Sequence, residues 1–271
     1  MSTDRRIAAN RRNWDDRVPI HLSSQFYDVE GWLRDAPGPR AAERELVGEV
    51  SGLELTHLQC HFGLDTLQWA RAGAVVTGLD FSPPAIDAAR ELATRSGLAE
   101  RARFVCADVH DAVDVLGAAS ADIVYVSIGA LCWLPSVERW AAQVAGILRP
   151  GGRLYLHEGH SIAWSMAEDE PRLQFTYFEE TEAYYSEDTA TYTDGDKALL
   201  HPGNYEWNHS LGETIMALAG HGLRLTWLEE HDWSDWPAFP WLIDMGDGRW
   251  GPPPGWPRWP LTFTLMAVKE G

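Results

Sequence analysis

Residues 53–80 read LELTHLQCHFGLDTLQWARAGAVVTGLD, and this stretch decides the fold class. Two short apolar runs, residues 53–60 and 74–80, flank a segment that has helical periodicity and begins near Asp65. A strand, a helix and a second strand in this order form the repeating unit of a parallel sheet, because parallel strands need a crossover connection. The stretch therefore predicts an open α/β sheet.

The same alternation continues toward the C-terminus. Helix starts are predicted at Ser82-Pro83, at Ser136 and at the capping box Ser210–Glu213, where hydroxyls can accept from the first free amides. Further apolar runs predict strands at residues 103–106, 122–127, 153–158, 223–228 and 261–268. With the first two runs, these give seven strands in an α/β, Rossmann-like sheet with helices on both faces.

Residues 160–209 interrupt this alternation and predict a cap inserted after the fifth strand. They are acidic and aromatic, and short strands are expected near 173–178 and 188–193. The acidic excess indicates a solvated surface or, alternatively, attraction of a cationic substrate. We expect one domain over residues 1–271, composed of an N-terminal helical lid (1–45), a cofactor-binding core (53–159), the cap (160–209) and a C-terminal part of the sheet (210–271).

Composition excludes several classes of function. The 271 residues carry 22 basic and 40 acidic side chains, a formal net charge of −18, which argues against nucleic acid as a partner. No apolar run is long enough to span a membrane, and the N-terminus lacks a signal peptide, so a cytoplasmic location is expected. Three cysteines without CxxC spacing predict neither disulfides nor a zinc module, and no metal site is expected.

Two acidic residues mark the expected ligand site. In open α/β sheets, ligands bind beyond the carboxyl ends of the strands. Asp80 ends the second strand, about twenty residues after the first turn, and such a carboxylate can accept both hydroxyls of a ribose. Asp108 follows the third strand and could accept from an adenine amino group. Either residue could instead be an ordinary turn or cap aspartate.

These positions resemble the class I S-adenosylmethionine-dependent methyltransferases. The resemblance rests on HLQCHFG (57–63), GLDFSPPAIDAAREL (78–92), FVCAD (104–108) and GILRPGGRLYLHE (146–158), and it is narrowest to small-molecule enzymes that carry this variant first loop. It implies an antiparallel last strand, S-adenosylmethionine as cofactor, S-adenosylhomocysteine as product, and O- or N-methylation of a small molecule.

The resemblance also implies a set of cofactor-binding residues. In related enzymes the N-terminal segment covers the cofactor, which brings in Trp14 and Tyr27, with His21 as a further lining residue. The complete set is Trp14, Tyr27, Gln59, Cys60, His61, Gly63, Asp80, Phe81, Ser82, Asp108, Val109 and Ser127.

The first loop departs from the family's glycine-rich pattern. His57 falls at the usual acid, and Gln59 and His61 fall at two of the usual glycines. We expect Gln59 and His61 to contact the methionine carboxylate. The alternative is a methyltransferase-like binding protein without catalytic activity. A nicotinamide-dependent oxidoreductase is a weaker alternative, because its GxGxxG loop would need three glycines and this loop has one.

The acceptor side is less defined. A hydroxyl acceptor needs a general base, and His160, after the fifth strand, is the predicted base, with His157, His201 and His209 as alternatives. A Trp/Pro-rich loop after the sixth strand favours a planar, apolar or cationic acceptor, or is simply packed by its own rings. Its tryptophans are Trp233, Trp236, Trp241, Trp250, Trp256 and Trp259.

Overall fold

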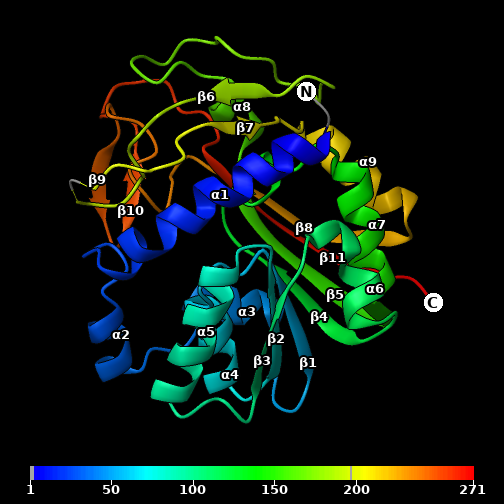
Figure 1. Cartoon of the computed structure of the whole chain (residues 1–271). Coiled ribbons are helices and arrows are strands. Elements are labelled where there is room, and N and C mark those ends of the chain that lie inside the picture. Colours follow the sequence, from blue (N-terminus) through cyan, green and yellow to red (C-terminus); the bar gives the residue numbers. More distant parts are fainter. Residues whose placement is uncertain (1–2, 196) are drawn as a thin grey trace.

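A seven-stranded sheet runs through the centre of the computed structural model, which describes residues 3–195 and 197–271 (Figure 1). The spatial order is β3-β2-β1-β4-β5-β11-β8, and only β11 is antiparallel to its neighbours. The predicted fold class and the reversed last strand are thus confirmed. The strands are β1 Glu54–Leu58, β2 Val75–Asp80, β3 Ala102–Cys106, β4 Ala121–Val126, β5 Leu148–Gly159, β8 Leu223–His231 and β11 Thr262–Lys269.

Helices cover both faces of the sheet because its central strands carry apolar side chains on both sides. In β4, Ile123 and Tyr125 belong to one buried cluster and Val124 and Val126 to another. The first face packs against α3 (Ala41–Val47), α4 (Leu64–Arg71) and α5 (Pro83–Arg95), and the second against α6 (Ala112–Leu116), α7 (Val137–Ile147) and α9 (Leu211–Gly220). Such continuous apolar strands are typical of sheets buried on both faces.

The helix starts lie close to the predicted positions. The hydroxyls of Ser82 and Ser136 accept from backbone amides in the first turns of α5 and α7. Ser210 and Glu213 form the predicted capping box at the start of α9. These caps satisfy amides that have no partner inside the helix.

The N-terminal helix α1 (Thr3–Leu22) crosses the molecule above the carboxyl ends of the parallel strands (Figure 1). Its Asp15 accepts from the Ser82 hydroxyl at 2.6 Å, and its Asn10 exchanges two hydrogen bonds with the backbone of Tyr205. Helix α2 (Val29–Asp35) follows and packs beside α4 and α5. Helix α1 therefore lies between the sheet and the segment inserted after β5.

The inserted segment differs from the prediction in its strands. The expected strands near 173–178 and 188–193 are wrong: the described part of the segment contains α8 (Ser161–Trp164), β6 (Tyr184–Ser186) and β7 (Asn204–Glu206), with an isolated bridge at Leu173. Residues 188–194 instead contact the N-terminal region through the side chains of Thr191 and Asp194. The acidic and aromatic composition of the segment does not determine where its strands lie, and neither predicted stretch forms a strand in the structure.

The remaining elements are short. Two 3₁₀ helices, η1 (Val109–Asp111) and η2 (Leu131–Trp133), follow β3 and β4, and a hairpin of β9 (Ile243–Gly246) and β10 (Arg249–Gly251) lies in the Trp/Pro-rich loop. No helix within the described ranges has the length and apolar character needed to cross a bilayer. Residues 1–2 of the predicted lid and residue 196 of the predicted cap lie outside the described residues.

Candidate functional site

The loop between β1 and α4 turns through three residues in the left-handed conformation. Gln59, His61 and Gly63 have φ angles of 57°, 50° and 79°. For a residue with a side chain this conformation costs about 1–2 kcal/mol. At Gly63 glycine is also required by space, because a Cβ would lie 2.7 Å from the Phe104 ring. The backbone thus follows a path suited to glycine at all three alternate positions.

Asp80 holds this loop in place. Its Oδ2 accepts from the His61 amide and its Oδ1 from the Ser82 amide, both at 2.9 Å. The residue is only 7% exposed, and burial raises the pKa of its carboxyl to about 6, against the effect of these hydrogen bonds. Asp80 therefore joins the end of β2 to the loop after β1 and retains a carboxylate at the carboxyl edge of the sheet.

Gln59 connects the same loop to the end of β4. Its Nε2 donates to the carbonyl of Ala130 at 2.7 Å, while its Oε1 is buried without a hydrogen-bond partner in the described structure. An unpaired buried carbonyl oxygen is unfavourable by about 1–3 kcal/mol. Gln59 consequently carries an unpaired acceptor oxygen that is buried within the first loop.

Glu158, at the end of β5, fixes the loop that receives Gln59. Its carboxylate accepts from the amides of Gly129, Ala130, Leu131 and Gly159 at 2.7–3.0 Å. Burial raises the pKa of Glu158, although these four bonds act in the opposite direction. One carboxylate thus sets the backbone of residues 129–131, which supplies the carbonyl that Gln59 contacts.

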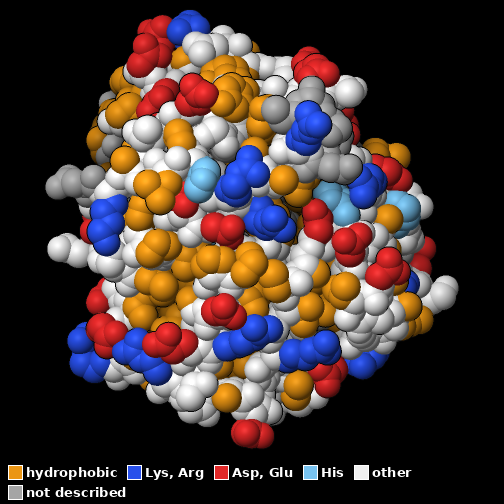
Figure 2. Space-filling view, viewed as in Figure 1, with side chains coloured by type: hydrophobic (Ala, Val, Ile, Leu, Met, Phe, Trp, Pro, Cys, Tyr) orange, Lys and Arg blue, Asp and Glu red, His pale blue; other side chains and the backbone are white. Residues whose placement is uncertain are grey.

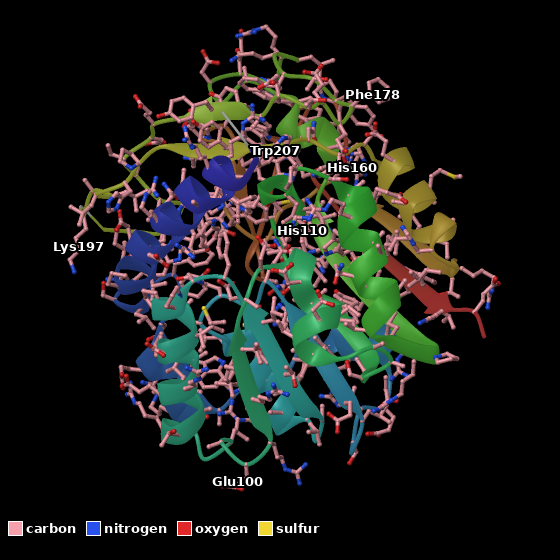
Figure 3. The ribbon with its side chains drawn as sticks, turned by 45° about the vertical axis from the view of Figure 1, so that its right-hand side comes forward. Glu100, His110, His160, Phe178, Lys197 and Trp207 are labelled. Carbon is pink, nitrogen blue, oxygen red and sulfur yellow. The ribbon has the colours of Figure 1, made fainter. Side chains whose placement is uncertain are left out.

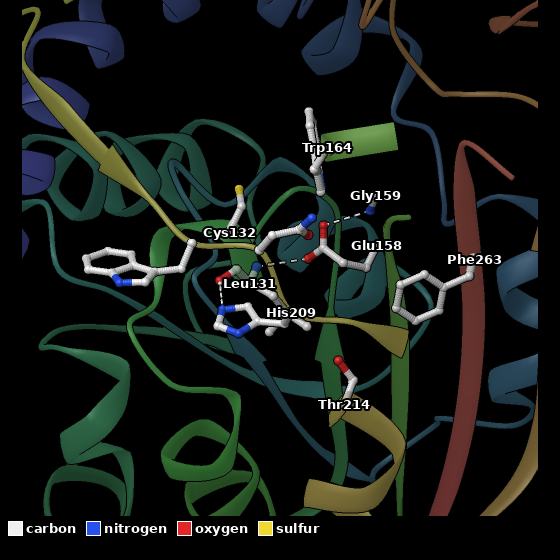
Figure 4. Close-up of a pocket in the computed structure, with 10 residues that line it drawn as sticks. Leu131, Cys132, Glu158, Gly159, Trp164, His209, Thr214 and Phe263 are labelled. Atoms are coloured by element: carbon white, nitrogen blue, oxygen red, sulfur yellow. Dashed lines mark hydrogen bonds between the residues drawn. The ribbon is translucent and has the colours of Figure 1, made fainter. Parts of the chain in front are cut away.

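A small void lies beside Glu158 (Figure 4). The close-up shows its carboxylate bonded to the amides of Leu131 and Gly159, while His209 reaches the carbonyl of Leu131 from below. The void measures about 10 Å³, which is close to the space of one water molecule. Its size makes it part of the structural support for the loop and not an acceptor pocket.

His61 connects the first loop to α1 and to the inserted segment. Its Nε2 lies 2.9 Å from His21 Nδ1, and His21 Nε2 lies 2.7 Å from the hydroxyl of Thr191. Burial lowers the pKa of His21 to about 3 and moves the pKa of His61 in the same direction. Both rings are therefore neutral at pH 7, and the N–H of one ring donates a hydrogen bond to the other.

The aromatic residues predicted from the N-terminal segment do reach this loop. Trp14 packs edge-on against His61 with ring centroids 5.2 Å apart, and Tyr27 packs against Phe62 at 4.8 Å. Tyr27 also exchanges a hydrogen bond with the hydroxyl of Tyr192 from the inserted segment. The N-terminal helix and the insertion thus meet over the first loop.

The other predicted cofactor residues lie along the same edge. Asp108 Oδ1 accepts from the His110 amide and lies 3.0 Å from its ring, so Asp108 caps η1, and these contacts lower the pKa of its carboxyl despite burial. The Ser127 hydroxyl donates weakly to Asp65 at 3.4 Å. Val109 and Cys60 are buried, Phe81 is half-buried, and Ser82 caps α5.

The predicted general base is fully engaged in structural contacts. His160 Nδ1 accepts from the Ile162 amide as the cap of α8, and its Nε2 lies 2.9 Å from Glu230. Figure 3 shows His160 and Trp207 under the inserted segment, with His110 lower, at the strand ends. Of the alternatives, His157 contacts Asp235 and Thr264, His201 contacts Asp16, and His209 contacts Glu179. His160 as the base stays a prediction.

Most tryptophans of the Trp/Pro-rich loop pack against other rings of the protein. Trp241 stacks on Phe239 at 4.6 Å and on Trp256 at 6.0 Å, and it contacts Trp259 at 5.7 Å. The guanidinium of Arg249 occupies a face of Trp233 at 4.4 Å. Much of this aromatic surface is therefore used in packing the loop.

The donors and acceptors at this edge suit a nucleoside that carries an amino acid. The Asp80 carboxylate can accept ribose hydroxyls, and the unpartnered Gln59 Oε1 can accept from an ammonium group. The two residues lie in or against one loop, at the carboxyl edge of the sheet.

Comparison with known proteins agrees with this geometry. Residues 56–156 match a family described as a methyltransferase domain, and no curated protein matches the sequence. The part of the chain from β1 to β5 is thus similar to a methyltransferase domain, and it lies in a sheet whose last strand is antiparallel. The matched residues extend from β1 to β5 and contain Gln59, Asp80 and residues 129–131, whose amides bind Glu158.

Solved structures of methyltransferases share the fold. A protein from Listeria monocytogenes, assigned as an S-adenosylmethionine-dependent methyltransferase, is 17% identical with a TM-score of 0.62, and the match covers 84% of this chain and 95% of that one. An S-adenosylmethionine-dependent methyltransferase from Mesorhizobium loti is 21% identical with a TM-score of 0.57 and coverages of 84% and 96%. Geranyl diphosphate C-methyltransferase from Streptomyces coelicolor, solved with S-adenosylhomocysteine, is 14% identical with a TM-score of 0.53 and coverages of 84% and 78%.

Two buried charged residues near the first loop were not predicted from the sequence, namely Glu158 and Arg17, whose guanidinium lies 5.1 Å from the ring centroid of Trp14. Glu158 stands at a strand end, so its position signalled an edge residue, but its role depends on the path of residues 129–131. Arg17 lies among several arginines of the N-terminal segment, and nothing in the spacing separates it from the exposed ones. Both required the folded contacts to be recognised.

Proposed function

We propose that this methyltransferase transfers a methyl group from S-adenosylmethionine to an oxygen or nitrogen of a small-molecule acceptor. The observation that carries the proposal is the bond between Asp80 Oδ2 and the amide of His61, because it places a carboxylate beside a left-handed loop at the sheet's carboxyl edge. The fold of the neighbouring methyltransferases supports the same assignment.

Three residues hold the cofactor in this proposal. Asp80 accepts the ribose hydroxyls, Gln59 Oε1 accepts from the methionyl ammonium, and Asp108 faces the adenine with the carboxylate oxygen that does not cap η1. Trp14 and Tyr27 close over the loop from the N-terminal side and exclude water.

The chain has little further chemistry to supply. The bound cofactor brings a methyl group already activated on a sulfonium, so the protein's main contribution is to hold the acceptor in line with it. Residues 129–131, fixed by Glu158, border that position at the end of β4. A hydroxyl acceptor would also require a base, for which His160 remains the predicted residue.

A thermal-shift comparison tests the cofactor. S-adenosylmethionine and S-adenosylhomocysteine should each raise the melting temperature in a concentration-dependent way, whereas NAD and NADP should not. Stabilisation by NAD alone would overturn the proposal.

A second measurement separates an enzyme from a binding protein. We expect S-adenosylhomocysteine to accumulate, by mass spectrometry, when the protein and S-adenosylmethionine are incubated with a panel of small phenols, amines and hydroxy acids. The Asp80→Asn variant serves as the control. Tight cofactor binding with no turnover on any acceptor would favour the inactive binding protein.

A further inference from the structure

Arg17 is a buried cation that the protein leaves incompletely paired. It is 8% exposed, and burial lowers the pKa of its guanidinium. Its Nε donates to Asn13 at 2.7 Å and its Nη1 donates to Thr191 at 3.4 Å. These two bonds use two of the five guanidinium N–H groups and leave three available for a ligand. Among the side chains that the structure describes, residues 5–195 and 197–271, no carboxylate lies within ion-pair distance of Arg17.

Two tryptophan rings hold the guanidinium in position. Its carbon lies 5.1 Å from the Trp14 ring centroid and 5.4 Å from that of Trp133, and the two rings are perpendicular to each other. Ring faces attract a cation but accept no strong hydrogen bonds. The rings therefore orient Arg17 and leave its remaining N–H groups without an acceptor.

Glu206 offsets this charge only from a distance. Its carboxylate interacts electrostatically with Arg17, but the two groups form no ion pair. In β7 the side chains alternate, and Asn10 of α1 anchors the neighbouring residue, Tyr205. A direct ion pair would be the usual arrangement for a buried arginine, so the guanidinium of Arg17 is left with unused hydrogen-bond donors.

The position of Arg17 relates this unpaired charge to the reaction. Trp14 touches His61 of the first loop, and Trp133 ends η2, which follows the loop fixed by Glu158. Thr191 comes from the inserted segment. Arg17 thus lies where the cofactor loop, the end of β4 and the insertion converge.

Helix α1 is also a basic region of an acidic protein. It contains five of the 22 basic residues, and Figure 2 shows Lys and Arg side chains gathered across the band of this face where Figure 1 places α1. An open groove of about 500 Å³ lies against its outer side, lined by Arg5, Arg12 and Tyr205 among others. The helix carries five arginines and three aspartates, so it is more basic than the protein as a whole, whose net charge is −18.

We propose that Arg17 is the receptor for a carboxylate group of a bound ligand, held between the rings of Trp14 and Trp133. Two molecules could supply that group, namely the methionyl end of the cofactor or an acceptor that is itself a carboxylic acid. The proposal rests on the proposed methyltransferase function and specifies the charge that the site selects. A guanidinium recognises a carboxylate through two parallel N–H donors, which lysine cannot reproduce.

The first experiment tests the cofactor as the source. Calorimetry compares S-adenosylhomocysteine, its decarboxylated amine analogue and 5′-methylthioadenosine on wild type, Arg17→Gln and Arg17→Lys. If the methionyl carboxylate binds Arg17, both variants lose about tenfold or more in affinity for S-adenosylhomocysteine. Affinity for the two analogues without a carboxylate stays within about twofold, which also shows that the variants are folded.

The second experiment tests the acceptor as the source. With S-adenosylhomocysteine saturating, a panel of aryl and alkyl carboxylic acids, each paired with its primary amide, is screened by thermal shift. If an acceptor supplies the carboxylate, acids stabilise the wild type and their amides do not. Arg17→Gln then abolishes that preference, while Arg11→Gln, at an exposed arginine of the same helix that does not line the groove, retains it.

Glu206→Gln provides a test of opposite sign. Removing the nearby negative charge should tighten binding of whichever carboxylate Arg17 receives. Two results together would overturn the proposal that Arg17 receives a carboxylate. The Arg17 variants would bind S-adenosylhomocysteine as tightly as the wild type does, and the wild type would show no preference for acids over their amides. A wild type that binds neither S-adenosylhomocysteine nor 5′-methylthioadenosine would instead overturn the proposed function itself.

Discussion

The amide of His61 donates to Asp80 Oδ2 at 2.9 Å, and this bond joins the strained first loop to the end of β2. It offsets part of the cost of a left-handed histidine, because a hydrogen bond to a charged acceptor contributes about 1.5–3 kcal/mol. A carboxylate has about four acceptor positions, and the amides of His61 and Ser82 use two of them. Asp80 can therefore stabilise the loop and still accept hydroxyls from a ligand.

Asp80→Asn should weaken S-adenosylhomocysteine binding at least tenfold by calorimetry. The amide keeps the size of the side chain but removes the charge and turns one acceptor into a donor, at a cost of about 1.5–3 kcal/mol per lost charged hydrogen bond. Asp87→Asn, an exposed aspartate at the start of the neighbouring α5, is the matched control and should bind like the wild type. Wild-type affinity in a folded Asp80→Asn variant would remove Asp80 from the cofactor site.

Cofactor affinity should fall as the pH is lowered through 6. Burial raises the pKa of Asp80 to about 6, so the carboxylate that accepts ribose hydroxyls is lost below that pH. Affinity should then decrease by up to about tenfold per pH unit, and binding near pH 6 should release protons. Calorimetry at pH 5.0, 6.0 and 7.5 in buffers of different ionisation enthalpy measures both effects.

The pH effect has an internal control. His21 does not titrate in this range, because burial lowers its pKa to about 3. The decrease should therefore disappear in Asp80→Asn, whose affinity is expected to be low at all three pH values. A variant that still shows the full pH dependence would assign the titration to another group.

Glu158→Gln should destabilise the protein and disorder the loop after β4. Four backbone amides converge on the carboxylate, and a carboxamide can accept them only through Oε1 while its NH₂ group faces donors. We expect a loss of about 2–4 kcal/mol, which corresponds to a decrease in melting temperature of roughly 5–10 °C for a chain of this size. Glu100→Gln, at an exposed loop position, should melt like the wild type. A decrease of less than 2 °C, measured by calorimetric melting, would contradict this role for Glu158.

The positions of the strands and the helix caps could be predicted from the sequence because they depend on local patterns. The apolar runs, Ser82, Ser136 and the Ser210 capping box all act on neighbouring residues, and the structure has them at the expected places. Asp80 could be placed because a strand end fixes it relative to the sheet edge. Its use by two backbone amides depends on how the loop of residues 59–63 folds back.

The contacts that could not be predicted from the sequence join segments that are far apart in the chain. His21 reaches His61 and Thr191, and Arg17 reaches Trp133, through the packing of α1 between the sheet and the insertion. No periodicity encodes the angle of that packing. The same reason explains why the strands of the insertion were misplaced, since residues 188–194 bind α1 and the adjoining turn by side chains and do not form a ladder.

The His61→Gly variant distinguishes a first loop that contributes to cofactor binding from a relic, meaning a loop that no longer does so. Glycine would relieve the left-handed strain at a φ of 50°, which favours the variant's fold by about 1–2 kcal/mol, but it would enlarge the unfolded ensemble. It would also remove the bond to His21 Nδ1 and the contact with Trp14, so α1 would be held less firmly over the loop.

We expect the lost contacts with His21 and Trp14 to affect cofactor binding more than the relieved strain does. The cofactor must be enclosed by α1, whereas the strain is already present in the free protein. S-adenosylhomocysteine affinity should decrease by about 1–3 kcal/mol in His61→Gly, measured by calorimetry. His61→Asn is the informative companion variant, since asparagine tolerates the left-handed conformation and keeps a polar group toward His21. It should bind with an affinity between those of the wild type and His61→Gly. Tighter binding by His61→Gly would show that the ring obstructs the cofactor, and the first loop would then be a relic.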